Sequence, residues 1–163
     1  MSRRFPLSLA GLVLCSAFTA ATAIAGPPWI SIELPANPMD PSTRDAYLLV
    51  HTFHHEQETR ELVSGQAIGF VNGKRTVIEL EFDRTSRPGV LALRKQWPDQ
   101  GAWVLALSVG PRDGQATALV GIGDDGTVRF VKVPTTRDAA RGSWPSRVTG
   151  ADVDAALRLL AGG

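Results

Sequence analysis

Apolar and polar residues alternate along most of the chain between residues 30 and 133. In the segment RTVIELEFD (75–83), Ile78, Leu80 and Phe82 alternate with three acidic residues. This period of two is typical of a β-strand with one buried and one solvated face. In AWVLALSV (102–109) both faces are apolar, which predicts a strand covered on both sides. The pattern predicts about eight strands, at residues 30–34, 46–54, 62–71, 75–82, 90–97, 102–109, 116–122 and 127–133.

Turn-forming residues separate these segments at short intervals. Asn72-Gly73 and Asp125-Gly126 predict hairpins, because both central residues of a type I′ turn have positive φ, which Asn, Asp and Gly tolerate. Short strands separated by such turns are typical of two packed antiparallel sheets. The sequence therefore predicts an all-β sandwich domain over residues 26–133.

The composition changes after this region. Residues 134–148 are polar and interrupted by Pro and Gly, which predicts a linker or a loop that follows the surface. Within residues 149–161, Thr149 and Asp152 have the spacing of a capping box, and an apolar stripe with helical period runs from Val153 to Leu160. We expect one short amphipathic helix that packs on the sandwich, since a helix of this length is marginal alone. Docking of the same stripe on a partner protein is the alternative.

Residues 1–25 have the features of a secretory signal peptide. Arg3 and Arg4 precede an apolar stretch, and an Ala-x-Ala pattern ends at Ala23 and again at Ala25. We expect cleavage after one of these alanines and a periplasmic or secreted protein. The alternative, a transmembrane anchor, is less favoured because the apolar stretch gives way to Ala and Thr instead of flanking charges. No membrane attachment is expected after cleavage of the signal peptide.

Charge and cysteine content narrow the classes of partner. Cleavage after Ala25 leaves 163 less 25, or 138 residues, enough for one domain with a single core. The chain has 17 basic and 16 acidic residues, and loss of Arg3 and Arg4 changes the net charge from +1 to about −1. This balance argues against nucleic acid or anionic membranes as partners, because both require concentrated positive charge. Cys15 leaves with the signal, which excludes disulfides and thiolate sites.

All three histidines, His51, His54 and His55, lie within LLVHTFHHEQETREL. In a strand, His54 and His55 point to opposite faces, and His51 and His55 are about 13 Å apart at about 3.3 Å per residue, too far to bind one ion. In a helix, all three would share one face and could chelate. The β-branched and aromatic residues of AYLLVHTF favour the strand.

A metal site at the end of this strand is an alternative. It would draw its ligands from His51, His54, His55 and Glu56, with Glu58 nearby, and would suit Cu(II) or Zn(II). The competing interpretation is that residues 56–61 are a solvated turn and that His51 is a half-buried strand residue with a hydrogen-bond partner. We favour this second interpretation, since runs of charge usually lie at the surface. No cofactor is therefore expected.

Motifs of catalysis are not recognisable. The sequence contains no G-x-S-x-G, no H-E-x-x-H and no glycine-rich phosphate loop. A site between the loops at residues 35–43 and 54–61 is the remaining enzymatic alternative. Trp29, Trp97 and Trp144 flank turns or the linker, where they either form a recognition patch or cover the edges of the sandwich.

The segment PGVLALRKQWPDQGAWVLALSV (88–109) resembles the closing strand pair of exported bacterial immunoglobulin-like domains of the YtkA/FixH type. The loose pattern of that family is matched by Gly89, Gly101, Trp103, Leu105 and Val109, while Leu91 stands where an aromatic is common. The resemblance implies an antiparallel immunoglobulin-like sandwich. Some relatives, and the similar copper-handling CopC-like sandwiches, imply metal or redox-assembly roles, but their methionine-rich segments and N-terminal histidine ligand are missing here.

These observations together predict an exported, non-catalytic binding or accessory module with an immunoglobulin-like β-sandwich and a short C-terminal helix. The expected partner is an unidentified protein or small ligand, and a periplasmic Cu or Zn carrier is the alternative.

Overall fold

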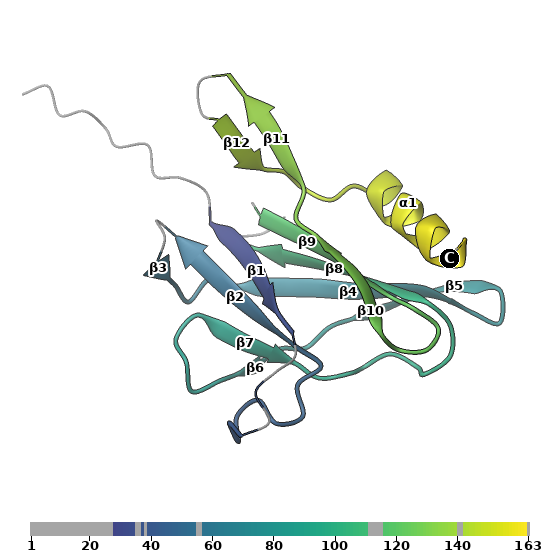
Figure 1. Ribbon diagram of the computed structural model, residues 1–163, viewed down its shortest axis with the longest axis horizontal. Helices are drawn as coiled ribbons and strands as arrows, with labels where there is room; N and C mark the ends of the chain where they lie inside the picture. The colour runs from purple at the N-terminus through teal and green to yellow at the C-terminus, as the bar shows by residue number, and fades with distance from the viewer. Residues whose placement is uncertain are drawn as a thin grey trace, which may run out of the picture.

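The computed structural model describes residues 28–34, 37, 39–54, 57–110, 116–139 and 142–162. Within these ranges the chain forms two five-stranded antiparallel sheets, a separate two-stranded hairpin and one helix (Figure 1). The expected signal peptide and its cleavage sites lie outside the described residues. In the described part, no helix is both long enough and apolar enough to cross a membrane.

The first sheet carries most of the residues discussed below. Its strands, in spatial order, are β1 (Trp29–Glu33), β2 (Leu48–His54), β7 (Val90–Leu93) and β6 (Asp83–Arg84). A short strand, β3 (Gln57–Glu58), turns back from the end of β2 and pairs with it. All of these pairings are antiparallel.

The second sheet faces the first across the core. Its order is β10 (Val128–Lys132), β9 (Ala116–Ile122), β8 (Trp103–Val109), β4 (Val63–Val71) and β5 (Lys74–Glu79). A sheet ordered β1-β2-β7-β6 opposite one containing β4-β8-β9 has the strand order of an immunoglobulin-like sandwich, with β5 and β10 added at the edges. The predicted all-β sandwich is confirmed.

The core between the sheets is apolar and closely packed. Leu48 and Val50 of β2 meet Leu105 and Leu107 of β8, and all four side chains are inaccessible to solvent. Trp103 is equally buried and fits because its β4 neighbour, Gly69, has no side chain: a Cβ there would lie 2.7 Å from the indole ring. Contacts of this density make the core sensitive to changes of a single methyl group.

Each of the eight predicted strands is present, some with shorter ends. The predicted strand at residues 90–97 corresponds to β7, which ends at Leu93, four residues before the predicted end at Trp97. Beyond it the Gln96 side chain bonds the backbone of Glu81, accepting from its N–H at 2.9 Å and donating to its carbonyl at 2.7 Å. A side chain thus takes the place of further ladder hydrogen bonds, which the sequence period cannot reveal.

The segment predicted as a linker, residues 134–148, contains a hairpin of β11 (Thr135–Asp138) and β12 (Gly142–Pro145). Its strands have four residues each, and the apolar residues of β12, Trp144 and Pro145, are adjacent in the sequence, so the segment lacks the alternation by which a strand is recognised.

The two predicted hairpin turns differ in type. Asn72 and Gly73 both have positive φ, 51° and 75°, as a type I′ turn requires. In the other hairpin only Gly126 has positive φ, at 76°, and the type I′ prediction for Asp125-Gly126 is wrong. The Asp125 carboxylate instead accepts from the backbone N–H and the hydroxyl of Thr127 at 3.0 and 2.7 Å. These bonds stabilise a longer loop with one left-handed residue.

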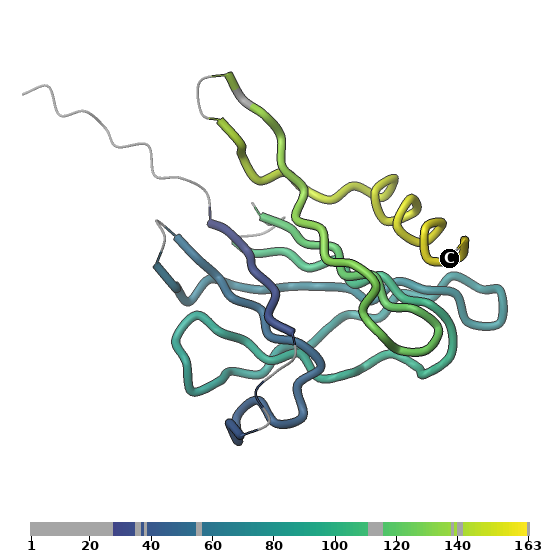
Figure 2. Tube along the Cα trace, viewed as in Figure 1, coloured from purple at the N-terminus to yellow at the C-terminus, as the bar shows by residue number. Residues whose placement is uncertain are grey.

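The helix α1 (Gly150–Ala161) follows the hairpin and has the predicted capping box between Thr149 and Asp152. Its apolar stripe lies on the outer face of the second sheet, where Leu157 packs in a cluster with Val104 and Leu119. Figure 2 shows the helix on the side of this sheet away from β1 and β2. The expectation that the helix packs on the sandwich is confirmed.

Candidate functional site

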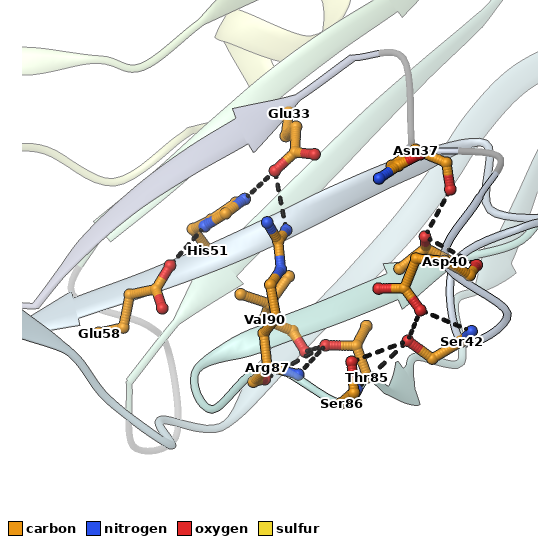
Figure 3. Close-up of polar contacts among 11 residues, drawn as sticks. Glu33, Asn37, Asp40, Ser42, His51, Glu58, Thr85, Ser86, Arg87 and Val90 are labelled. Atoms are coloured by element: carbon orange, nitrogen blue, oxygen red, sulfur yellow. Dashed lines mark hydrogen bonds and ion pairs between the residues drawn. The ribbon is translucent and has the colours of Figure 1, made fainter.

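A chain of four charged or ionisable side chains lies on the outer face of the first sheet (Figure 3). Nε2 of His51 is 2.7 Å from Oε2 of Glu33, and Nδ1 is 2.9 Å from Oε1 of Glu58. Arg87, in the turn between β6 and β7, donates to the same Glu33 oxygen at 2.8 Å. We refer to these four residues as the histidine–carboxylate chain.

The register of three strands places these residues on one face. Leu48 and Val50 point into the core, so His51 and Phe53 point outward from β2. On β1 the partner of His51 is Ser31, and Glu33 lies two residues beyond Ser31, so its side chain is on the same face. Glu58 of β3 is directly opposite Phe53. The rings of His51 and Phe53 are parallel within 6°, with centroids 6.0 Å apart.

The central histidine is the least accessible member of the chain. Its side chain is 12% exposed, compared with 34% for Glu33, 38% for Glu58 and 43% for Arg87. Carboxylate oxygens accept hydrogen bonds and do not donate, so both contacts of His51 are made fully only by the ring that carries protons on both nitrogens. Charge-assisted bonds of this kind are stronger than neutral ones.

The neighbours of Glu33 favour its ionised form. The hydrogen bond from Arg87 is the largest cause of a lowered pKa for the Glu33 carboxyl; partial burial opposes it, and the hydrogen bond from His51 adds to the lowering. The same contact with Glu33 raises the pKa of the Arg87 guanidinium. Glu33 therefore remains a carboxylate between two donors at neutral pH.

Further hydrogen bonds fix the turn that carries Arg87. The Arg87 N–H donates to the Thr85 hydroxyl oxygen at 3.1 Å, and the Ser86 N–H donates to Ser42 Oγ at 3.3 Å. Ser42 in turn donates to Asp40 at 2.7 Å, and this hydroxyl is the main cause of a lowered pKa for Asp40. The loop before β2 is therefore joined to the β6–β7 turn, as Figure 3 shows.

A cavity of about 410 Å³ opens beside Arg87, and we call it the inter-sheet cavity. One wall is formed by residues 59–63, which lead into β4, another by residues 84–91 of the β6–β7 hairpin, and its floor includes Leu80 and Phe82. The loop at residues 54–61 thus contributes to this cavity. The loop at 35–43 contacts the same hairpin through Ser42, on the outer face of the sheet.

The described part of the sequence-predicted metal site does not converge. The predicted strand through the histidines is confirmed as β2, and His51 and His54, three residues apart in it, point to opposite faces. His55 and Glu56 lie outside the described residues. In the part that the structure describes, no three His, Cys, Asp or Glu side chains are grouped to hold a metal ion.

The contacts of His51 match the favoured interpretation of it as a half-buried strand residue. Its two nitrogens face away from each other across the ring, so Glu33 and Glu58 approach from opposite sides and cannot share one ion with it.

The three tryptophans occupy different environments. Trp29 is 37% exposed and lies on the outer face opposite Phe53. Trp97 is only 5% exposed and contacts Tyr47 edge-on, with ring centroids 5.0 Å apart, so it belongs to the core and not to a surface patch. Trp144 is half-buried in β12. The structure does not bring Trp29 and Trp97 together on one surface.

Sequence reasoning did not identify Glu33, Arg87 or the cavity-lining Arg60 and Arg84. Each lies in a short strand or turn, and its role depends on a neighbour far along the chain, such as the 54 residues that separate Glu33 from Arg87. No signal within one segment could have found them.

Comparisons with known proteins return no significant match to a family model, a curated protein or a solved structure.

Proposed function

We propose that the chain is an exported, non-catalytic binding module and that its ligand occupies the inter-sheet cavity. The observation that carries this proposal is the cavity itself. Its volume of about 410 Å³ lies within the range of small-molecule sites, about 300 to 1,000 Å³. Its lining joins apolar Leu80, Phe82 and Leu91 to polar Thr59 and Arg84, the mixture by which such sites provide both affinity and orientation.

The fixed geometry of the walls supports a binding role. The Thr52 hydroxyl bonds the carbonyl of Thr59 on one side of the cavity and contacts the carbonyl of Gly89 on the other. The Arg87 turn is held by Thr85 and by Ser42, as described above. Walls held in this way lose little conformational entropy when a ligand enters.

The contacts of His51 favour binding over catalysis. A general base needs an unprotonated nitrogen within reach of its substrate. Both nitrogens of His51 are engaged by carboxylates, and its ring lies on the outer face of the sheet. This arrangement suits a positioning role for Glu33 and Arg87 better than proton transfer.

A neutral apolar dye tests the cavity without assuming the charge of the ligand. We expect N-phenyl-1-naphthylamine to bind the full-length, folded protein saturably at one site per chain, with enhanced fluorescence. Leu91→Trp replaces an aliphatic side chain of the cavity wall by a bulky indole ring and should abolish this signal, whereas Leu159→Trp, at an exposed position on α1, should not. Near-UV circular dichroism would verify that each variant is folded. Absence of saturable binding, or equal binding by folded Leu91→Trp, contradicts the proposal.

Export is tested separately by the N-terminus of the protein recovered after expression with its own leader. Cleavage after Ala23 or Ala25 gives a mature chain that begins at Ile24 or Gly26. Recovery of an uncleaved chain in the cytoplasm would contradict the export part of the proposal and leave the cavity unaffected.

A further inference from the structure

We infer that the ligand of the inter-sheet cavity is an amphiphilic anion, a small molecule with a carboxylate on an apolar body. The inference rests on the proposed function, because it names the ligand class for the same cavity. Three features of the lining carry it: uncompensated positive charge, an inward-facing apolar wall and an unbonded hydroxyl.

The lining has excess positive charge. It contains three arginines, Arg60, Arg84 and Arg87, and one acidic residue, Glu61. Arg87 is compensated by its bond to Glu33. Among the described residues, neither Arg60 nor Arg84 has an ion-pair partner. Two guanidinium groups are therefore available at the cavity, and guanidinium binds carboxylate through paired hydrogen bonds.

The position of Arg84 points this charge toward the space between the sheets. In the β6–β7 pairing Arg84 is directly opposite Leu91, and Leu91 is directly opposite Val50, a core residue. Residues paired in this way share one face of a sheet, so Arg84 lies on the inter-sheet face. Its side chain is exposed and thus sits at the cavity mouth.

The apolar part of the lining would hold the body of such a ligand. Val63, Leu80 and Phe82 pack against the main core and form the inner end of the cavity. Leu91 also faces inward but is only half-buried, and Leu62 at the rim is 74% exposed. Covering this surface removes apolar area from water, at about 25 cal/mol per Å².

A polar group of the lining also lacks a partner. Thr59 lines the cavity, and its hydroxyl oxygen is buried without a hydrogen bond to any described residue. Leaving a buried hydroxyl unbonded is unfavourable. Because this oxygen has almost no accessible surface, a ligand carboxylate would accept from it only after a small movement of the Thr59 side chain toward the cavity.

The inward position of Arg84 has a competing explanation. Inward-pointing charges on edge strands prevent sheets of different molecules from pairing. The two explanations predict different effects when the charge of Arg84 is removed. If Arg84 is protective, its loss leaves ligand affinity unchanged and increases self-association. If Arg84 binds the ligand, its loss lowers the affinity for anions alone.

Four probes separate charge from apolar contact: octanoate, octan-1-ol, octylammonium and acetate. Calorimetry and ¹H–¹⁵N spectra of the full-length protein would measure affinity and position. We expect saturable binding of octanoate with shifts at Thr59, Arg84 and Leu91, and binding of octan-1-ol weaker by about tenfold, since a charge-assisted bond is lost. Acetate lacks the apolar body and octylammonium has the wrong charge, so both should bind more weakly still.

Two variants test the arginine at the mouth. Arg84→Gln should weaken octanoate binding by about tenfold and leave octan-1-ol binding unchanged. Arg137→Gln, which removes an exposed arginine from β11, should change neither. Unchanged octanoate affinity in Arg84→Gln, with or without increased self-association, overturns the inference.

The four probes also distinguish the inferred ligand class from the proposed function on which it rests. If octan-1-ol or octylammonium binds as tightly as octanoate, the cavity is a binding site but not an anion site, and only the inference fails. Acetate binding as tightly as octanoate likewise overturns the amphiphilic ligand. If neither the octyl probes nor the neutral dye saturates, the proposed function itself is wrong.

Discussion

The outer faces of the two sheets are covered in different ways. On the second sheet, α1 lays its apolar stripe over Ile68, Val104 and Leu119, and this contact is mainly hydrophobic. One exposed ion pair, between Arg75 of β5 and Asp154 of α1, is added to it. On the first sheet a small apolar cluster that includes Leu49 is fully buried beneath the loop before β2, and beside it the surface is formed by the histidine–carboxylate chain. The helix over the second sheet stabilises the domain by burial of apolar surface, while the histidine–carboxylate chain on the first sheet holds charged groups in fixed positions.

This difference shows where to look for function in the molecule. Apolar contacts are non-directional, and their contribution depends on the area removed from water. Hydrogen-bonded charges are directional, contribute little net stability at a surface, and leave costly unpaired partners when one is removed. The chain from Glu58 to Arg87 thus adds little to folding, but it positions Arg87 at the cavity.

The largest effect is expected where the apolar covering is broken. Leu157→Ala removes a helix side chain that is 8% exposed and should lower the free energy of unfolding by about 2 to 3 kcal/mol. Leu159→Ala, two residues away and 66% exposed, should lower it by less than about 0.5 kcal/mol. Urea denaturation of both variants measures the difference. Equal effects would mean that the helix is not held by its stripe.

A smaller effect is expected from the start of the same helix. Thr149→Ala removes the hydroxyl that accepts from the Asp152 N–H at 3.3 Å and donates to its carboxylate at 2.6 Å. We expect a loss of about 1 kcal/mol in urea denaturation. Thr135→Ala, at an exposed position in β11, is the matched control and should have little effect. Because the two capping residues act together, Thr149→Ala and Asp152→Ala should be less than additive.

The elements with a signal inside one segment could be predicted from the sequence. The alternation around Ile78 marks a strand, and the Thr149–Asp152 spacing marks the start of the helix, because both patterns arise from local geometry. The extended chain through His51 was predictable for the same reason. Its consequence, that the histidines do not share one face, followed from the strand period.

The site itself required pairing information that the sequence does not contain. Glu33 and His51 are 18 residues apart and meet only because β1 pairs with β2 in one particular register. Arg84 belongs to a two-residue strand, which is too short to show any period. The inward direction of its side chain, and with it the charge of the cavity, becomes visible only when the partner of that strand is known.

Within the histidine–carboxylate chain, Glu33→Gln tests the carboxylate that bonds both His51 and Arg87. At pH 7 we expect a loss of about 0.5 to 1 kcal/mol, the size of a surface ion pair. The pKa of Glu33 is lowered from its ordinary value of 4.5, so its contribution is present above that pH and is lost as the pH falls through the lower folded-state pKa. The difference between the wild type and the variant should therefore shrink below pH 4.5.

Thermal unfolding of the wild type and Glu33→Gln between pH 3 and pH 7 would measure this trend. Glu81→Gln, which removes an exposed carboxylate outside the histidine–carboxylate chain, is the control for the general effect of net charge. A difference between wild type and Glu33→Gln that stays constant across the range would show that the bonds to Arg87 and His51 do not stabilise the folded state.

The smallest effect is expected for metal binding by His51, the central residue of the histidine–carboxylate chain. Both nitrogens of His51 are occupied by carboxylates on opposite sides of the ring, and a metal ion would have to displace one of them. We therefore expect His51→Asn to leave the Zn(II) affinity of the protein within about twofold of the wild type in calorimetric titration. His54→Asn and His55→Asn, measured alongside, locate any binding by the neighbouring histidines. A tenfold or greater loss of Zn(II) affinity in His51→Asn would mean that the histidine–carboxylate chain is a metal site. The two outer faces would then differ as a structural surface and a metal-binding surface.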